Sequence, residues 1–328
     1  MVRLHAAVGS APLAVALFFI GTAPSALADP FTFTSLSVAG SASTRAFGIN
    51  NSGEVVGEYT TSGPYQGFSF SGGVFTNPIG TTDQYPTGVN NSGEITGFLF
   101  SDSSAAAFLN IGGVFSASHY PGPNAFGNLP VDTYAYGIND LGQIVGYADN
   151  GTIFGFLLSG GVYTGFSFPG TANPHSATSA FGINNSGQIV GDYSTGGVTL
   201  GFLLSGGVYT SLAFPGAAVT EARGINNNGQ IVGIYATPGA SEGDYHGFLL
   251  SGGVYTTIDF PGASSTLASG INDLGQITGS YNIGNETING FLAMPTSEPG
   301  SFAMVLLGAG CLGVCLFCQR IRPPLRAL

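Results

Sequence analysis

The chain contains no lysine and no tryptophan, and its 328 residues include only six arginines. Between residues 29 and 295 two basic residues, Arg45 and Arg223, stand against sixteen Asp and Glu. Because such an acidic surface repels phosphate backbones, we do not expect nucleic acid as a partner. Gly, Ser, Thr, Asn, Phe and Tyr are abundant instead, which is typical of an all-β extracellular domain rich in tight turns.

Cysteine is confined to the C-terminal end of the chain. All three cysteines, Cys311, Cys315 and Cys318, follow residue 300. The preceding 300 residues therefore lack a disulfide framework and offer no thiol for catalysis or metal binding.

The N-terminal segment has the pattern of a secretory signal. Residues 1–28 contain a lone Arg3, an apolar run over residues 13–20, and the small residues Ala26 and Ala28 on either side of Leu27. This small-x-small pattern predicts cleavage by signal peptidase after Ala28, which leaves Asp29 as the new N-terminus. A retained N-terminal membrane helix is the alternative, but the apolar run is short for one.

The C-terminal residues 296–328 predict a membrane anchor. Uncharged residues 300–318 are followed by Arg320 and Arg322, which indicates a transmembrane helix with its C-terminal end in the cytoplasm. With Glu298-Pro299 ahead of it, this order resembles the PEP-CTERM sorting tail of Gram-negative bacteria. The resemblance implies processing by an exosortase and a place in the cell envelope or extracellular matrix. The full Pro-Glu-Pro motif is absent, because Ser297 occupies its first position, so a permanent anchor is the alternative.

An internal repeat fills residues 29–295. A Gly-Ile/Val-Asn phrase recurs 40 to 49 residues apart, a period that fits a propeller blade. Its glycines are Gly48, Gly88, Gly137, Gly182, Gly224 and Gly270. In the fifth copy, Asn227-Asn228-Gly229 and Ser251-Gly252-Gly253 predict two tight hairpins, and hence four strands over residues 222–226, 230–235, 247–250 and 254–260.

The two ends of the repeat array complement each other. Residues 32–40 align with the fourth strand of a copy, residues 254–262, whereas the last copy stops after its third strand. We therefore predict a six-bladed β-propeller whose N-terminal strand completes the last blade, since closure removes exposed sheet edges. An open β-solenoid is the rival, but the varying repeat length disfavours stacking in register.

The repeat also resembles the HAF family of exported bacterial proteins. Residues 184–191, Asn-Asn-Ser-Gly-Gln-Ile-Val-Gly, fit its pattern, and His246-Gly247-Phe248 stand at its His-Ala-Phe position. The resemblance covers nearly all of residues 31–293 and implies no particular activity. Other copies replace the histidine by Gln66, Ala106, Phe154, Leu200 or Asn289, so a common histidine ligand is not expected.

No catalytic constellation stands out in the sequence, and we predict no enzyme. His119, His175 and His246 lack metal-motif spacing, and there is no Gly-x-Ser-x-Gly elbow. We expect no cofactor. Calcium is the alternative, although the repeat loops carry fewer acids than calcium-binding loops do. A glycoside hydrolase would need a pair of the acids that break the repeat. These acids are Glu58, Asp83, Asp102, Asp132, Asp149, Asp192, Glu221, Glu242, Asp244, Asp259 and Glu286.

The expected function is binding of carbohydrate or protein at the cell envelope, without catalysis. Propeller loops commonly carry the ligand site, and the variable loops here contain Tyr120, Tyr134, Tyr245, Asp244 and Glu242. These are the candidate ligand-binding residues. A polysaccharide hydrolase or lyase and a ligand-free structural spacer are the alternatives.

Overall fold

The computed structural model describes residues 30–77, 83–101, 104–122, 130–170, 177–241, 243–284 and 287–296. In these ranges the chain forms β-strands and no helix, so none crosses a membrane as a long apolar helix. The all-β prediction is confirmed. The signal-peptide prediction with Ala28, and the tail prediction with Glu298, Pro299, Arg320 and Arg322, lie outside the described residues.

The strands group into six four-stranded antiparallel units, here called blades 1 to 6. Blade 1 contains β2 (Ser43–Ile49), β3 (Val55–Thr60), β4 (Gln66–Ser71) and β5 (Val74–Thr76). Blade 2 contains β6 (Gln84–Val89), β7 (Ile95–Ser101), β8 (Ser104–Ile111) and β9 (Val114–Ser118). Blade 3 contains β10 (Asp132–Ile138), β11 (Ile144–Asp149), β12 (Ile153–Ser159) and β13 (Val162–Phe166).

The second half of the chain repeats this plan. Blade 4 contains β14 (Thr178–Ile183), β15 (Ile189–Thr195), β16 (Val198–Ser205) and β17 (Val208–Leu212). Blade 5 contains β18 (Val219–Ile225), β19 (Ile231–Ala236), β20 (His246–Ser251) and β21 (Val254–Ile258). Blade 6 contains β22 (Ser265–Ile271), β23 (Ile277–Asn282), β24 (Ile288–Pro295) and β1 (Phe31–Leu36).

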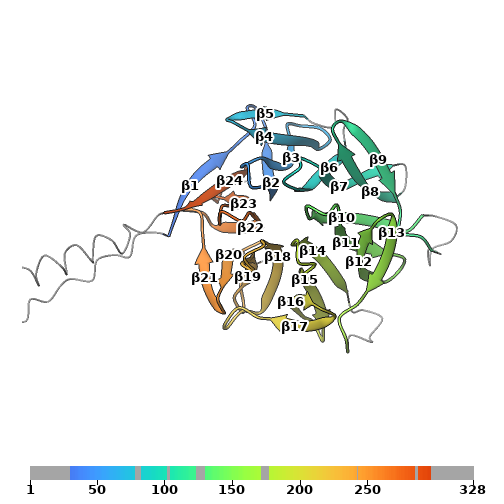
Figure 1. The fold of residues 1–328 in the computed structure, drawn as a ribbon. Helices are drawn as coiled ribbons and strands as arrows, with labels where there is room; N and C mark the ends of the chain where they lie inside the picture. The colour runs from blue at the N-terminus through green and yellow to red at the C-terminus, as the bar shows by residue number, and fades with distance from the viewer. Residues whose placement is uncertain are drawn as a thin grey trace, which may run out of the picture.

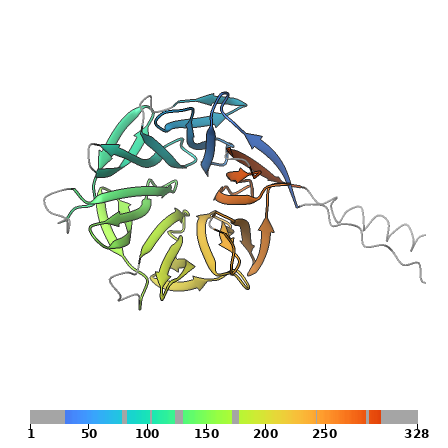
Figure 2. The same ribbon diagram turned by 180° about the vertical axis from the view of Figure 1, so that it is seen from behind.

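The blades are arranged in a ring around a central axis, which is the shape of a β-propeller (Figure 1). The first strand of each blade lies nearest the axis, and the same ring is seen from its opposite face in Figure 2. The sheets do not join into one closed sheet. Single-residue parallel pairings join blade 6 to blade 1, at Ser43 and Ile288, and blade 4 to blade 5, at Thr199 and Val219.

The strand boundaries in blade 5 follow the sequence prediction within a few residues. One difference is the end of β21, which stops at Ile258 instead of Phe260. The Phe260 amide donates to the Thr266 hydroxyl at 3.0 Å, so it is not available to the strand ladder. A side-chain acceptor in β22 therefore ends the strand before Pro261 does.

Each blade is held by a phenylalanine packed over a glycine. Phe248 in β20 pairs with Gly233 in β19 and is fully buried, and a β carbon on Gly233 would lie 2.9 Å from that ring. The same glycine-phenylalanine pairing recurs in every blade. The six buried rings are Phe68, Phe108, Phe156, Phe202, Phe248 and Phe291. This packing explains why the phrases Val/Thr-Gly and Gly-Phe, or Ala-Phe in blade 2, recur together in the sequence.

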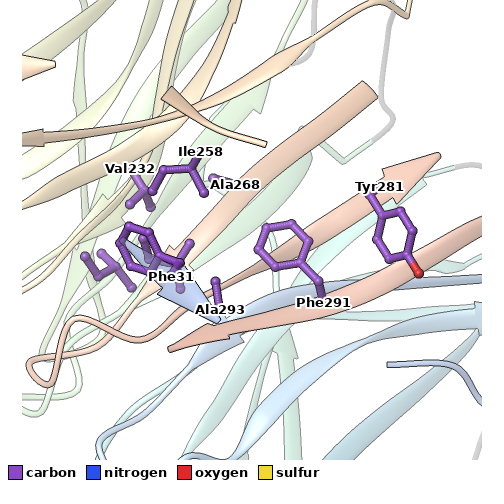
Figure 3. Close-up of a cluster of buried hydrophobic side chains, with 9 residues drawn as sticks. Phe31, Val232, Ile258, Ala268, Tyr281, Phe291 and Ala293 are labelled. Carbon is purple, nitrogen blue, oxygen red and sulfur yellow. The ribbon is translucent and has the colours of Figure 1, made fainter. Parts of the chain in front are cut away.

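The N-terminal strand completes blade 6. β1 pairs antiparallel with β24 along its whole length, from Phe31 opposite Pro295 to Leu36 opposite Gly290. Phe31 is buried beside Phe291 and Ala293 in the core cluster between blades 5 and 6 (Figure 3). Two chain segments more than 250 residues apart thus share one sheet and one core.

Candidate ligand-binding site

The propeller has two different faces because the strands of each blade run antiparallel. The turn face carries the hairpin after each first strand, such as residues 50–54, and the Gly-Gly turn after the third strand of blades 1 to 5, such as Gly72-Gly73. The loop face carries the connections that differ among the copies, including residues 237–245. The loops that vary in the sequence therefore share one face.

Two rings of side chains close the axis at the turn face. In the first ring, the amide of each Asn donates to the backbone carbonyl of the corresponding Asn in the next blade, and Asn272 donates to Asn50 at 2.9 Å. Its members are Asn50, Asn90, Asn139, Asn184, Asn226 and Asn272. The six blades are thus linked around the full circle.

The second ring lies one residue further along the chain, in the turn after each first strand, and consists of Asn51, Asn91, Asp140, Asn185, Asn227 and Asp273. The side chain of each member accepts the backbone N–H of the corresponding residue in the preceding blade. Asp140 and Asp273 also accept two Asn side-chain amides each. Although burial opposes it, these hydrogen bonds lower the pKa of both carboxyls. Their oxygens therefore serve blade-to-blade contacts, while the local Asx turns of these two hairpins are made by Asn139 and Asn272. Among the described residues no group of three His, Cys, Asp or Glu is placed to hold a metal ion.

The repeated glycines form a narrow waist in the axis. A β carbon on Gly88 would lie 2.6 Å from the Tyr136 carbonyl oxygen of the next blade. Adjacent first strands thus approach so closely that only glycine fits. The waist encloses about 70 Å³ and the Asn rings below it about 60 Å³.

A larger cavity of about 480 Å³, here called the mouth, opens at the loop-face end of the axis. Its lining comes from all six blades: Phe47, Glu58, Tyr85, Thr87, Phe98, Tyr136, Tyr147, Ile153, Ser179, Phe181, Arg223 and Ser269. The volume lies within the roughly 300–1,000 Å³ typical of small-molecule sites.

The mouth is built at the positions where the six copies differ. One set immediately precedes the axial glycines: Phe47, Thr87, Tyr136, Phe181, Arg223 and Ser269. The other follows the glycine of the second strand, where Glu58, Phe98 and Tyr147 of blades 1 to 3 line the mouth. The equivalent residues of blades 4 to 6 are Asp192, Ile234 and Ser280. Next to them the glycines and asparagines are the same in every copy, because ring packing requires them. The side chains at these positions are not fixed by the packing of the ring, so they can differ and can contact a ligand.

Aromatic rings from neighbouring blades form one wall of the mouth. The ring of Tyr136 lies 5.7 Å from Tyr147, nearly parallel, and 5.1 Å from Phe181, edge to face. Tyr85 stacks on Phe98 at 4.8 Å, and the Phe98 ring lies 5.8 Å from Tyr136. The wall is thus a continuous aromatic surface over blades 2 to 4.

Two arginine–glutamate ion pairs border the mouth, and each contributes one residue to its lining, Glu58 and Arg223. Arg45 Nη1 donates to Glu58 Oε1 at 2.9 Å, and Arg223 Nε and Nη2 donate to Glu221 Oε2 at 3.2 and 2.8 Å. Burial raises the pKa of Glu58, and Arg45 opposes that rise. The two pairs leave the mouth almost without net charge from these four groups.

Asp192 is a further acid beside the mouth. It pairs in register with Ser179, which lines the mouth. Burial raises the pKa of Asp192 to about 7, Glu221 adds to the rise, and Arg223 opposes it. Its carboxyl is therefore partly protonated near neutral pH.

The structure separates the candidate residues that the sequence grouped. Tyr134 lies on β10, not in a loop, and stacks on Tyr147 at 4.7 Å beside the mouth. Tyr120 packs edge to face against Phe154 at 4.9 Å in the core of blade 3. Tyr120 therefore contributes to the hydrophobic core of blade 3.

The connection between β19 and β20 contains the other three candidates, Tyr245, Asp244 and Glu242. Tyr245 is half-buried, and its amide donates to Ser265 Oγ at 3.2 Å. Asp244 is exposed, and its carboxylate accepts the Ser241 amide at 3.3 Å. Glu242 lies outside the described residues. The described contacts of Tyr120, Tyr245 and Asp244 do not bring them together at one site.

Sequence reasoning did not single out Arg223, Tyr136, Tyr147 or Phe98 as ligand-binding residues. Their signal was present, since each breaks a repeat position whose neighbours are constant. Of the eleven acids that break the repeat, the structure places Glu58 in the lining of the mouth and Asp192 and Glu221 beside it; the sequence did not distinguish these three from the others.

No family model matches the chain, and no curated protein matches it. Among solved structures, a fucose-specific lectin from Aleuria aurantia is similar at 11% identity, over 81% of this chain and 100% of the lectin, with a TM-score of 0.47. A mutant of AofleA from Arthrobotrys oligospora is similar at 12% identity, over 81% of this chain and 91% of that one, with a TM-score of 0.44. A prolyl endopeptidase is similar at 8% identity over 82% of this chain and 43% of its own length, with a TM-score of 0.44.

Proposed function

We propose that this propeller is a non-catalytic carbohydrate-binding domain whose site is the mouth. The carrying observation is the combination of an aromatic wall with polar groups at the positions where the copies diverge. A sugar ring has an apolar C–H face, which packs on aromatic rings, and hydroxyls that need both donors and acceptors. Tyr136 and Phe98 supply the aromatic rings, and Arg223 and Glu58 supply a hydrogen-bond donor and acceptor.

The positions of the termini support display of the site at a cell surface. The Thr296 amide donates to the Pro30 carbonyl at 2.9 Å, so the described chain begins and ends side by side. β24 is the third strand of blade 6 and, like the third strands of the other blades, runs toward the turn face. β1 pairs with it antiparallel, so β24 ends and β1 begins at the turn face. If the predicted tail anchors the protein in a membrane, the mouth points away from that membrane. From the predicted signal and tail, together with this placement of the chain ends, we propose that the protein is exported and resides in the cell envelope or extracellular matrix.

A polysaccharide hydrolase is a second candidate, favoured by Asp192. A carboxyl whose pKa is raised to about 7 suits a general acid, and Glu221 is close enough to contribute to that rise. Against it, Glu221 and Glu58 are each paired with an arginine, which ties up the second carboxylate that hydrolysis requires. Turnover of a bound glycan, abolished in Asp192→Asn, would establish this candidate.

The test is a glycan array with the full-length chain purified in detergent, followed by a search for reaction products. We expect binding without cleavage. Phe98→Ala removes part of the aromatic wall and should weaken binding at least tenfold. Phe115→Ala is the matched control, because Phe115 lies on β9, the edge strand of the same blade, is 39% exposed and does not line the mouth. Equal binding by the wild type and Phe98→Ala would contradict the proposal.

A further inference from the structure

We infer that the mouth receives the uncharged terminal residue of a saccharide chain, inserted along the propeller axis, with one site per chain. This inference rests on the proposed carbohydrate binding and names the part of the glycan that is recognised. It follows from the depth of the mouth, its charge and its lack of symmetry.

The mouth is a blind pocket for anything larger than water. Below it the glycine waist and the Asn rings enclose only about 70 and 60 Å³. The waist has little room to widen, because a β carbon on Gly48 would already lie 2.9 Å from the Gly88 α carbon. A polymer therefore cannot thread through the axis, and a ligand enters and leaves at the loop face.

The position of the aromatic wall selects a chain end. Tyr136, Phe181 and Phe47 lie directly above the waist, one residue before the axial glycines. A sugar residue must descend along the axis to stack on them. An internal residue could do so only if the polymer folded back on both sides, whereas a terminal residue descends with one linkage pointing outward.

The charges of the mouth favour an uncharged sugar. Arg223 already donates twice to Glu221, and Arg45 is held by Glu58 and by the Tyr65 hydroxyl at 3.1 Å. A carboxylate or sulfate on the ligand would compete with these bonds beside Asp192, in a domain where acids outnumber bases sixteen to two. A cationic sugar would meet the Arg223 guanidinium in the lining.

The six copies place different side chains around the mouth, so the propeller has one asymmetric binding site there. The six residues that precede the axial glycines differ in size and charge, with Arg223 in blade 5 and aromatic rings in blades 1, 3 and 4. Only the combination of blades around the axis supplies both the stacking surface and the polar groups. Binding between blades at repeated positions would instead give several equivalent sites.

The experiment compares matched glycans on the full-length chain in detergent. The probes are maltotriose, mannotriose, N-acetyllactosamine and fucosylated lactose, each immobilised with its nonreducing end uncapped or capped by sialic or glucuronic acid. We expect at least one uncapped probe to bind, its capped form to bind at least tenfold more weakly, and calorimetry with that probe to give one site per chain. Phe98→Ala should lose the binding, and Phe115→Ala, on the outer strand of the same blade, should retain it within twofold.

The outcomes separate the two proposals. Binding that tolerates the caps, or a stoichiometry of several sugars per chain, overturns the recognition of an uncharged end while carbohydrate binding stands. Binding that survives Phe98→Ala places the sugar outside the mouth and overturns this inference too. If none of the probes binds, both proposals fail for this protein.

Discussion

Asp192 links the mouth to the stability of the whole propeller. Burial raises its pKa to about 7 from an ordinary value of 3.8. Between these values the folded protein holds a proton that the unfolded chain has released. Stability is therefore greatest below the unfolded value and falls as the pH rises through about 7.

The size of this effect follows from the pKa difference. One pKa unit corresponds to about 1.4 kcal/mol, so a shift from 3.8 to about 7 sets an upper limit near 4 kcal/mol. Asp192 is half-buried and lies at a cavity open to solvent, which screens the cost of its charge. We expect wild-type protein to lose about 1–2 kcal/mol of unfolding free energy through this group between pH 4.5 and 8. Asp192→Asn has a similar shape without the charge and should not lose it.

Urea unfolding at pH 4.5 and pH 8, followed by circular dichroism, measures this difference. Asp192→Asn should be the more stable protein at pH 8 and nearly equal to wild type at pH 4.5. Asp244→Asn is the control for loss of one negative charge, because Asp244 is exposed in the loop between β19 and β20. Parallel pH curves for the wild type and Asp192→Asn would refute the reasoning, since they would mean that Asp192 ionises without cost in the fold.

Four further predictions concern the ring and its core. Asn226→Ala removes four hydrogen bonds at a buried position and should cost about 2–4 kcal/mol in urea unfolding, against under about 1 kcal/mol for Asn228→Ala, whose side chain is exposed. Phe248→Ala should cost about 3–5 kcal/mol by the same assay, whereas Val254→Ala, 65% exposed, should change stability by less than about 0.5 kcal/mol. Gly88→Ala should lower the melting temperature because its β carbon would meet the Tyr136 carbonyl, while Gly63→Ala, with nothing within 4 Å, should not; equal melting temperatures would rule out the tight waist. Deletion of residues 30–36 should give aggregates in size-exclusion chromatography, because it uncovers the β24 edge and the Phe291 core; a monomer as stable as wild type would show that β1 is dispensable.

Local residue patterns determined the blades. An Asn-Ser-Gly, Asn-Asn-Gly or Asp-Leu-Gly turn fixes the first hairpin of each copy, since the turn needs a positive φ at its glycine, for example 73° at Gly229. The repeated glycine and phenylalanine positions set the register of the second and third strands. The alignment of residues 32–40 with residues 254–262 identified the strand that now pairs with β24. These features depend on neighbours in the same copy or on the period of the repeat, and both are visible in a sequence.

Only the tertiary structure decided which residues meet at the mouth. Arg223, Asp192, Tyr136 and Phe98 belong to four different blades, and no local pattern relates their directions. They converge because the ring places equivalent positions of successive copies at the same height around one axis. Tyr120, by contrast, was chosen as a loop aromatic and is packed against Phe154 instead. The sequence by itself determined six similar blades, whereas their circular arrangement turned six differing residues per ring into one asymmetric site.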